Sequence, residues 1–254
     1  MQADSGTVVA RTLSQRRITE HLRVLRVATD EAIAFKAGQF TKIGFPAAEG
    51  ERPLMRSYSF VNPPGADCYE FCYSILPEGG NLTPQLDRLA EGDELLVSTR
   101  PAGFLVLEEI PQADNIFLVA TGTGIGPFMS IMDTDEPWQR FKKVVLAHGV
   151  ARSADMAYRA KLDELAAKYP DQFKLATLVT REQHPGSLNM RIPQAFAAGK
   201  IQQIAGVSLD PANCQFMLCG NPAMVKETSA WLAEQGLPRN RRSVPGNVTI
   251  EKYW

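Results

Sequence analysis

The run LVATGTGIGPFMS at residues 118–130 contains a glycine-rich turn between an apolar strand and the start of a helix. Gly122, Gly124 and Gly126 would let the backbone approach a ligand without side-chain clash. Backbone amides at such a turn, together with the helix dipole, bind nucleotide phosphates. The spacing is G-x-G-x-G rather than the usual dinucleotide pattern, so a tight turn without a ligand is the alternative.

Arginines follow the next two predicted strands. Arg152 comes after VVLAHG at 144–149, Arg181 comes after TLVT, and Arg191 lies ten residues further on. In NAD-binding folds an acid about 20 residues beyond the glycines binds the ribose 2′-hydroxyl, whereas an arginine accommodates a 2′-phosphate. The strand at 144–149 has no acid at its end, so the pattern favours NADP over NAD. The alternative is that these arginines are solvated surface charges.

A second anion site is predicted in the first half of the chain. PEGGNLTPQLDRL at 77–89 has a glycine turn, then Thr83 as a predicted N-cap and Pro84 in the first helical turn. Arg56 stands upstream in RSYS at 56–59. Two separate anion sites indicate two nucleotides. An ordinary capped helix with an unrelated arginine is the alternative.

The elements that would position these residues fall into two halves. In YEFCYSI at 69–75 every second residue is apolar, which predicts a strand with one buried face. A single helix is predicted at 84–90, and turn signals separate the short runs, which favours an antiparallel barrel or sandwich. Further strands are predicted at 22–27, 39–45 and 94–99.

The second half alternates apolar strands with helices, which predicts a parallel sheet covered on both faces. The helix at 153–169 has Ser153 as its predicted N-cap, and the helix at 222–236 stops at Gly236. The predicted domains are residues 1–106 and 107–254. Strands are predicted at 116–120, 144–147, 174–179 and 215–218.

Composition excludes several classes of protein. The 254 residues carry 27 Lys and Arg against 28 Asp and Glu, a net charge of -1, which argues against binding of nucleic acid by bulk charge. No apolar run approaches the roughly 20 residues of a membrane span, and the N-terminus has no signal-peptide pattern. The four cysteines form no C-x-x-C pair, and the histidines show no metalloprotease spacing. We therefore expect a reducing, cytoplasmic setting and no metal.

Five motifs, taken together, resemble the ferredoxin–NADP reductases, and most closely the bacterial type that ends in tryptophan. They occur in the family's order and span nearly the whole chain. The resemblance implies an antiparallel FAD-binding barrel followed by a Rossmann-like NADP-binding α/β domain. The motifs are RSYS at 56–59, GGNLTPQL at 79–86, ATGTGIGPF at 120–128, CGNPAMV at 219–225 and EKYW at 251–254.

The implied enzyme passes a hydride from NADPH to FAD and then single electrons to ferredoxin or flavodoxin, reversibly. Arg56 would contact the FAD pyrophosphate, Tyr58 would lie against one face of the flavin ring, and Ser59 would sit near flavin N5. The last residues would cover the opposite face, Trp254 acting as a lid that NADP(H) displaces. The other implied FAD contacts are Phe60, Gly80, Asn81, Leu82, Thr83 and Tyr253.

On the NADP side, Cys219 would border the nicotinamide. Glu251 would supply a proton or tune the flavin. Several relatives have arginine three residues after the strand-end histidine, whereas here Ala151 follows His148 at that distance and Arg152 is displaced by one place. The implied NADP contacts are Thr121, Gly122, Thr123, Gly124, Gly126, Arg152, Arg181, Arg191, Cys219, Gly220 and Asn221.

The expected partner is a small acidic electron carrier, and a monomer is expected. Candidate docking residues are two basic clusters, since opposite charge steers weak complexes. One rival function is a flavin reductase that serves an oxygenase, or a general NADPH diaphorase. A second rival is a non-catalytic subunit that senses a nucleotide. The basic clusters are Arg16 and Arg17, and Arg239, Arg241 and Arg242.

Overall fold

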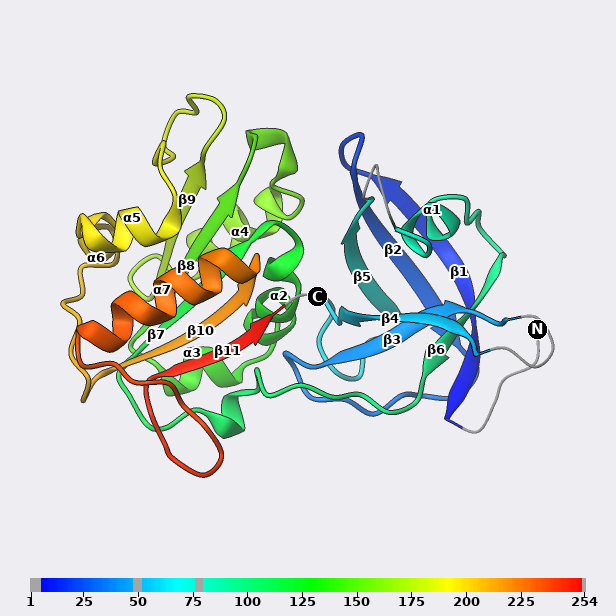
Figure 1. Ribbon diagram of the computed structural model, residues 1–254, viewed down its shortest axis with the longest axis horizontal. Coiled ribbons are helices and arrows are strands. Elements are labelled where there is room, and N and C mark those ends of the chain that lie inside the picture. The colour runs from blue at the N-terminus through cyan, green and yellow to red at the C-terminus, as the bar shows by residue number, and fades with distance from the viewer. Residues whose placement is uncertain (1–5, 48–51, 76–79, 253–254) are drawn as a thin grey trace.

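The protein consists of a barrel and a parallel sheet with helices, joined side by side (Figure 1). The computed structural model describes residues 6–47, 52–75 and 80–252. The last barrel strand ends at Ser98 and the first strand of the parallel sheet begins at Asn115. The predicted fold class is confirmed.

The first lobe is an antiparallel sheet. Its strands are β1 (Thr7–Arg17), β2 (Leu22–Thr29), β3 (Phe40–Phe45), β4 (Leu54–Ser59), β5 (Tyr69–Ser74) and β6 (Glu94–Ser98). They pair in the order β4-β3-β6-β1-β2-β5. An antiparallel bridge between Phe60 and Phe71 joins the two edges and so closes the barrel. The alternation in β5 is confirmed, because Tyr69, Phe71 and Tyr73 all pack in the barrel core.

The helix of the barrel is shorter than predicted. Helix α1 spans Thr83–Leu86 and ends where Asp87 pairs with the buried Arg23, whose Nε lies 2.6 Å from the Asp87 carboxylate. Its N-cap position is Leu82, and no side chain caps it. The prediction that Thr83 caps this helix is therefore wrong, because Thr83 is already the first helical residue.

The second lobe contains a parallel sheet. Its strands are β7 (Asn115–Thr121), β8 (Lys143–Val150), β9 (Phe173–Val179), β10 (Cys214–Gly220) and β11 (Val248–Lys252). Their order is β11-β10-β7-β8-β9. The chain therefore builds outward from β7 in one direction and then returns to its other side at β10. This reversal leaves a crevice at the carboxyl ends of β7 and β10, where open α/β sheets bind ligands.

Helices cover both faces of this sheet. One face carries α2 (Gly126–Met132), α3 (Glu136–Arg140) and α4 (Arg159–Lys168), and the other carries α5 (Ile192–Ala197), α6 (Lys200–Ala205) and α7 (Pro222–Glu234). The side chains of β7 alternate between the two cores, so that Leu118 and Ala120 face α2 while Phe117 and Val119 face α7. Short 3-10 helices are η1 (Leu107–Glu109), η2 (Gly122–Ile125) and η3 (Ser153–Asp155).

The predicted N-cap Ser153 is also wrong. Ser153 lies in η3, and the α-helix begins six residues later at Arg159. The Ser153 hydroxyl donates instead to the Glu182 carboxylate at 2.6 Å. Tyr158, Leu162, Leu165 and Tyr169, in and beside α4, all pack on one core.

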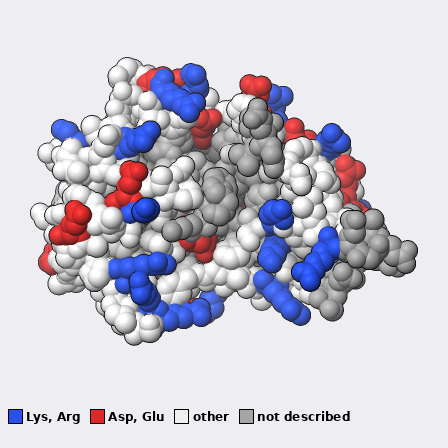
Figure 2. Space-filling view, in the orientation of Figure 1, with Lys and Arg blue, Asp and Glu red and all other residues white. Residues whose placement is uncertain are grey.

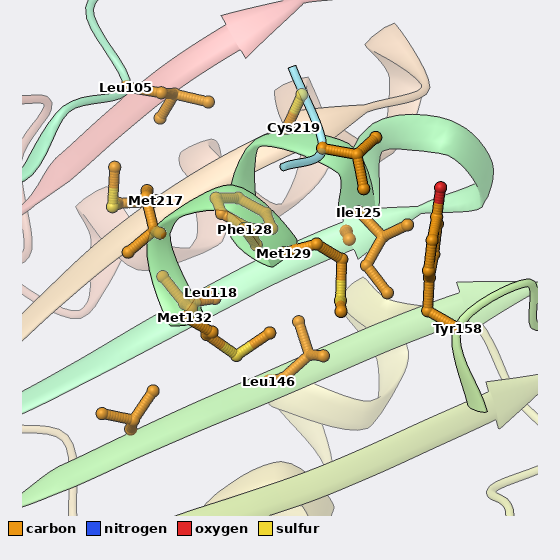
Figure 3. Packing of buried hydrophobic residues seen from close by; sticks show 14 of the residues in the cluster. Leu105, Leu118, Ile125, Phe128, Met129, Met132, Leu146, Tyr158, Met217 and Cys219 are labelled. Atoms are coloured by element: carbon orange, nitrogen blue, oxygen red, sulfur yellow. The ribbon is translucent and has the colours of Figure 1, made fainter. Parts of the chain in front are cut away.

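The two lobes share a hydrophobic core. Figure 3 shows Ile125, Phe128 and Met129 at its centre, with Cys219 on one side and Tyr158 on the other. Val61 of the barrel packs in the same cluster. Hydrogen bonds join the lobes as well, among them those from the Ser130 hydroxyl to the Asn62 carbonyl (2.7 Å) and from the Tyr158 hydroxyl to Glu70 (3.0 Å). Burial of apolar surface is the main stabilising force at such a junction.

Within these described ranges, no helix is both long and apolar enough to cross a lipid bilayer. In the same part of the chain, no group of three or more His, Cys, Asp or Glu side chains is arranged to hold a metal ion.

Candidate functional site

A cleft of about 720 Å³ opens at the carboxyl ends of β7 and β10. Its floor is the two turns that follow these strands, and its opposite wall comes from the β1–β2 turn and the end of β5 in the barrel. The cleft therefore lies between the lobes. Among its lining residues are Thr121, Gly122, Thr123, Gly220, Asn221, Thr19, His21 and Ser74.

The two turns of the floor are tied together. The Asn221 amide donates to the Thr121 hydroxyl at 2.8 Å, and the Asn221 side chain accepts from the Ala223 amide at 2.8 Å to cap α7. Gly220 has a φ of 124°, and a β-carbon there would lie 2.3 Å from the Thr121 hydroxyl oxygen. Only glycine fits this turn, because a side chain would be both strained and in collision.

The predicted arginines divide into two sets. Arg181 and Arg191 line the cleft, and so does Ala151, whereas Arg152 does not. Arg152 pairs instead with Glu182, with 3.7 Å between Nη1 and the carboxylate. The one-residue displacement of Arg152 in the sequence therefore also changes which side chain lines the cleft. The residue three places after His148 is Ala151, and Ala151 lines the cleft in place of an arginine.

Glu182 is held in place by Ser153. Its carboxylate accepts from the Ser153 hydroxyl and from the Ser153 amide, at 2.6 and 2.7 Å. These hydrogen bonds lower the pKa of Glu182, the hydroxyl contributing most. Glu182 is therefore a fixed negative charge that holds Arg152 at the outer side of the loop.

Two of the predicted glycines serve packing. A β-carbon on Gly124 would lie 2.6 Å from the Cys219 carbonyl oxygen, so η2 can approach β10 only without a side chain there. A β-carbon on Gly126 would lie 3.7 Å from Ser59 Cβ and 3.5 Å from Val61 Cγ2 of the barrel. Anything larger would push the lobes apart. Neither glycine lines the cleft.

These contacts bring Ser59, Cys219 and Glu251 to the same junction. Ser59 ends β4 and is buried against Gly126. Cys219 is fully buried and contacts Gly124, and it is in register with Glu251 on the neighbouring strand β11. Ser59 and Cys219 thus lie against the segment 124–126 that follows the floor of the cleft, and Glu251 lies on the strand beside Cys219.

Glu251 occupies a poorly solvated position. Burial raises its pKa to about 7, and a hydrogen bond with the Phe104 backbone opposes this only in part. Its Oε1 is buried and has no hydrogen-bond partner within the described residues. Gly103 leaves room for this carboxyl, because a β-carbon there would lie 2.9 Å from Glu251 Oε2. The carboxyl group can therefore gain or lose a proton near neutral pH.

On the barrel side, Tyr58 is half-buried on β4 and meets Tyr73 edge to face, with 6.1 Å between ring centroids. Burial raises the pKa of Tyr58 to about 12, although nearby Arg56 lowers it slightly, so the phenol stays neutral. Arg56 is exposed and donates to the Met55 carbonyl at 2.8 Å. A neutral ring and a solvent-facing guanidinium stand two residues apart on one strand face.

The turn before α1 offers a polar atom without a partner. The Thr83 hydroxyl is buried and lacks a hydrogen bond within the described residues. Gly80 and Asn81 lie partly or fully exposed beside it, whereas the Leu82 side chain is buried in the core together with Leu86. The Phe60 ring is also fully buried, stacked on Phe35, and its backbone amide donates to the Gln39 carbonyl at 3.1 Å. Tyr253 and Trp254 lie outside the described residues.

Comparisons with known proteins agree with this architecture. Residues 118–230 match the family model for an oxidoreductase NAD-binding domain. A flavodoxin/ferredoxin–NADP reductase of Escherichia coli is 39% identical over 223 residues, which are 87% of this chain and 89% of that protein. A ferredoxin–NADP reductase of Pseudomonas aeruginosa is 35% identical over 257 residues, covering 98% of each chain. The chain belongs to the flavodoxin/ferredoxin–NADP reductase family.

A solved structure of a family member supports the same conclusion. The ferredoxin NADP+ reductase of Neisseria gonorrhoeae, crystallised with FAD and NADP, superposes with a TM-score of 0.92 at 30% identity, over 99% of this chain and all of that one. The resemblance inferred from the sequence motifs is therefore confirmed.

Sequence reasoning missed two parts of this flavodoxin/ferredoxin–NADP reductase site. The barrel wall of the cleft, which includes Thr19 and His21, is formed by tertiary packing and has no local sequence signal. The buried His148, whose Nε2 lies 3.1 Å from the Gly122 carbonyl oxygen, also escaped notice as a contact of the glycine turn. Its only signal was a histidine at the end of an otherwise apolar strand.

Replacing Glu251 with glutamine tests its environment in this family member. Because the folded-state pKa of about 7 lies above the ordinary 4.5, folding favours the protonated acid, and stability is lost as pH rises from about 4.5 to about 7. At pH 8.5 we expect Glu251→Gln to be more stable than the parent by about 3 kcal/mol in urea denaturation, and equal to it near pH 4.5. The exposed Glu164→Gln variant is the control for loss of one charge. A parent–variant difference that does not change with pH would contradict this.

Proposed function

We propose that this protein is an FAD-dependent oxidoreductase that passes a hydride from NADPH to FAD and single electrons from FAD to ferredoxin or flavodoxin, reversibly. The observation that carries the proposal is the placement of Ser59 and Cys219 against the segment 124–126 behind the cleft floor, with Glu251 in register beside Cys219. The names of the relatives described above include the same substrates: ferredoxin, flavodoxin and NADP. When bound, FAD supplies the chemistry that links two-electron to one-electron transfer.

The barrel residues fit FAD. The exposed Arg56 guanidinium and the Thr83 hydroxyl, which has no hydrogen-bond partner among the described residues, are donors suited to phosphate oxygens. Tyr58, which shares one hydrophobic cluster with Leu82 at the start of α1, offers a neutral ring for the flavin. Phe60, Gly80 and Asn81 complete the proposed FAD site. We take residues 1–106 as the FAD domain and 107–254 as the NADP domain.

The cleft residues fit NADP(H). Arg181 and Arg191 would hold the adenosine phosphates, and the turns at 121–123 and 220–221 would hold the pyrophosphate and nicotinamide portions. Gly124 and Gly126 contribute by close packing, as described above. Arg152 is removed from the proposed contacts, because its partner is Glu182.

Three side chains, those of Ser59, Cys219 and Glu251, would act at the reacting centre. Ser59 and Cys219 border the space where the two rings would meet. Glu251 would hold a proton on its carboxyl group near neutral pH, for transfer to or from the flavin edge. Strand β11 runs toward the barrel (Figure 1), and the residues after it, Tyr253 and Trp254, would cover the flavin face opposite Tyr58.

The partner would dock beside the segment between α7 and β11. Figure 2 shows Lys and Arg side chains along the lower edge of both lobes, and in Figure 1 this segment lies at the lower edge of the α/β lobe. Arg239, Arg241 and Arg242 are exposed there, and Arg242 lies over the Phe104 ring at 5.4 Å. Because the Phe104 backbone contacts Glu251, this cluster adjoins the reacting centre. Arg16 instead lines a separate cavity that includes Asp133 and Tyr158.

A cytoplasmic, monomeric enzyme is part of the proposal. The thiols of Cys68, Cys72 and Cys214 are free and buried, which supports a reducing compartment.

Coenzyme selectivity tests the proposal. We expect the purified protein to carry FAD and to oxidise NADPH in preference to NADH under anaerobic conditions. Arg181→Ala should raise the KM for NADPH about tenfold or more and leave the KM for NADH nearly unchanged, because the lost guanidinium faces only the 2′-phosphate. The matched control Arg152→Ala should stay within about twofold of the parent for both coenzymes. A colourless protein, or equal effects of both variants, would refute this account.

Charge reversal tests the docking surface. We expect the triple variant Arg239→Glu, Arg241→Glu and Arg242→Glu to reduce the second-order rate with ferredoxin about tenfold at low ionic strength, with a weaker dependence on salt. Reduction of a small inorganic acceptor should not change. The double variant Arg16→Glu and Arg17→Glu is the matched control and should behave like the parent. If the control reacted more slowly with ferredoxin while the triple variant reacted at the parent rate, docking would lie elsewhere.

A further inference from the structure

His148 is a buried titratable residue with no part in the proposed hydride path. It lies on β8, in register with Ala120 of β7 and Thr177 of β9, and is 1% exposed. Its Nε2 is 3.1 Å from the Gly122 carbonyl oxygen. A carbonyl oxygen only accepts hydrogen bonds, so Nε2 must carry the proton and donate. Nδ1 is buried and has no partner within the described residues.

The donor is a neutral imidazole. Burial lowers the pKa of His148 to about 4, against smaller opposing effects of the Gly122 hydrogen bond and the Asp155 charge. At neutral pH the side chain therefore contributes a dipolar N–H group and no positive charge. Its effect on an anion in the cleft must act through the geometry of the turn.

The contact is made at the first residue of η2, in the glycine turn. Gly122 has a φ of 53°, lines the cleft, and would leave an added β-carbon without neighbours within 4 Å. In a trans peptide, the carbonyl and the next amide point in opposite directions. Drawing the Gly122 carbonyl inward to His148 therefore turns the Thr123 amide outward, toward the cleft that Thr123 lines. Without this hydrogen bond only the first turn of η2 would hold the peptide, and a rotation would bring a carbonyl oxygen toward any anion bound there.

We propose that His148 is a positioning residue for coenzyme binding. Its Nε2–H fixes the Gly122–Thr123 peptide so that an amide, and not a carbonyl, meets the pyrophosphate of NADP(H). This rests on the proposed function, in which NADP(H) occupies this cleft. The adenosine 2′-phosphate would be held separately by Arg181 and Arg191, so His148 should affect one phosphate site and spare the other.

Two ligands separate these effects. NADP+ carries the pyrophosphate, whereas adenosine 2′-monophosphate has only the phosphate that the arginines would hold. By calorimetric titration of the FAD-loaded protein, we expect His148→Leu to weaken NADP+ binding about tenfold, as for loss of one well-oriented hydrogen bond. Adenosine 2′-monophosphate should bind within about twofold of the parent. Steady-state KM for NADPH should rise in parallel, with kcat nearly unchanged.

Two further variants serve as controls. In His148→Gln the side-chain amide nitrogen can take the place of Nε2, so this variant should recover NADP+ affinity to within about threefold of the parent. Thr228→Val removes a different buried polar group of the same lobe, a hydroxyl without a partner among the described residues. This variant should leave both affinities unchanged.

The outcomes distinguish the inference from the function on which it rests. Parent-like NADP+ binding by His148→Leu would overturn the role of His148 while leaving the proposed function intact. Equal weakening of both ligands would show a general structural role and would overturn the inference as well. A parent protein that binds neither ligand would overturn the proposed function, and this inference with it.

Discussion

The close approach of η2 to β10 and to the barrel is the constraint on which the site depends. Gly124 has no space for a β-carbon against the Cys219 carbonyl, and Gly126 abuts Ser59 and Val61. Because tightly packed interiors tolerate little added volume, Gly124 sets how closely η2 approaches β10, and Gly126 lies at the contact between the lobes. They also bring the end of β4, the end of β10 and the register partner Glu251 to one place. The glycine motif thus builds the junction as well as the floor of the cleft.

The polar groups around this junction follow from the same packing. Glu251 is poorly solvated because the segment through Gly103 and Phe104 closes over it, which raises its pKa into the neutral range. Tyr58 stays neutral because the barrel buries it. Exposed charges lie further out, at Arg56 and along the segment after α7. The arrangement is apolar and neutral at the reacting centre and basic at its margin, which suits hydride transfer inside and docking of an acidic carrier outside.

Local patterns predicted much of this from sequence. The apolar runs of β7, β8, β9 and β10 and the alternation in β5 could be predicted, because burial of a strand leaves a recognisable pattern of hydrophobic residues in the sequence. Strands β1 and β11 were not, since they carry many polar residues and depend on their neighbours. The capping predictions at Thr83 and Ser153 were wrong because contacts with residues distant in sequence decide where each helix begins. The hydrogen bond from Ser153 to Glu182 is an example. The packing role of Gly124 and the contact from His148 to Gly122 likewise depend on residues distant in sequence.

In the proposed function, this junction would hold the flavin and nicotinamide rings in one fixed orientation. The most direct test is anaerobic rapid mixing of the FAD-loaded protein with NADPH deuterated at C4 on one face or the other, following loss of the visible flavin band. A fixed orientation predicts that deuterium on one face slows the loss while deuterium on the other face leaves the rate unchanged. If deuterium on either face slowed the loss of the flavin band equally, the rings would not be held in one orientation. No loss of the band at all would also contradict the account.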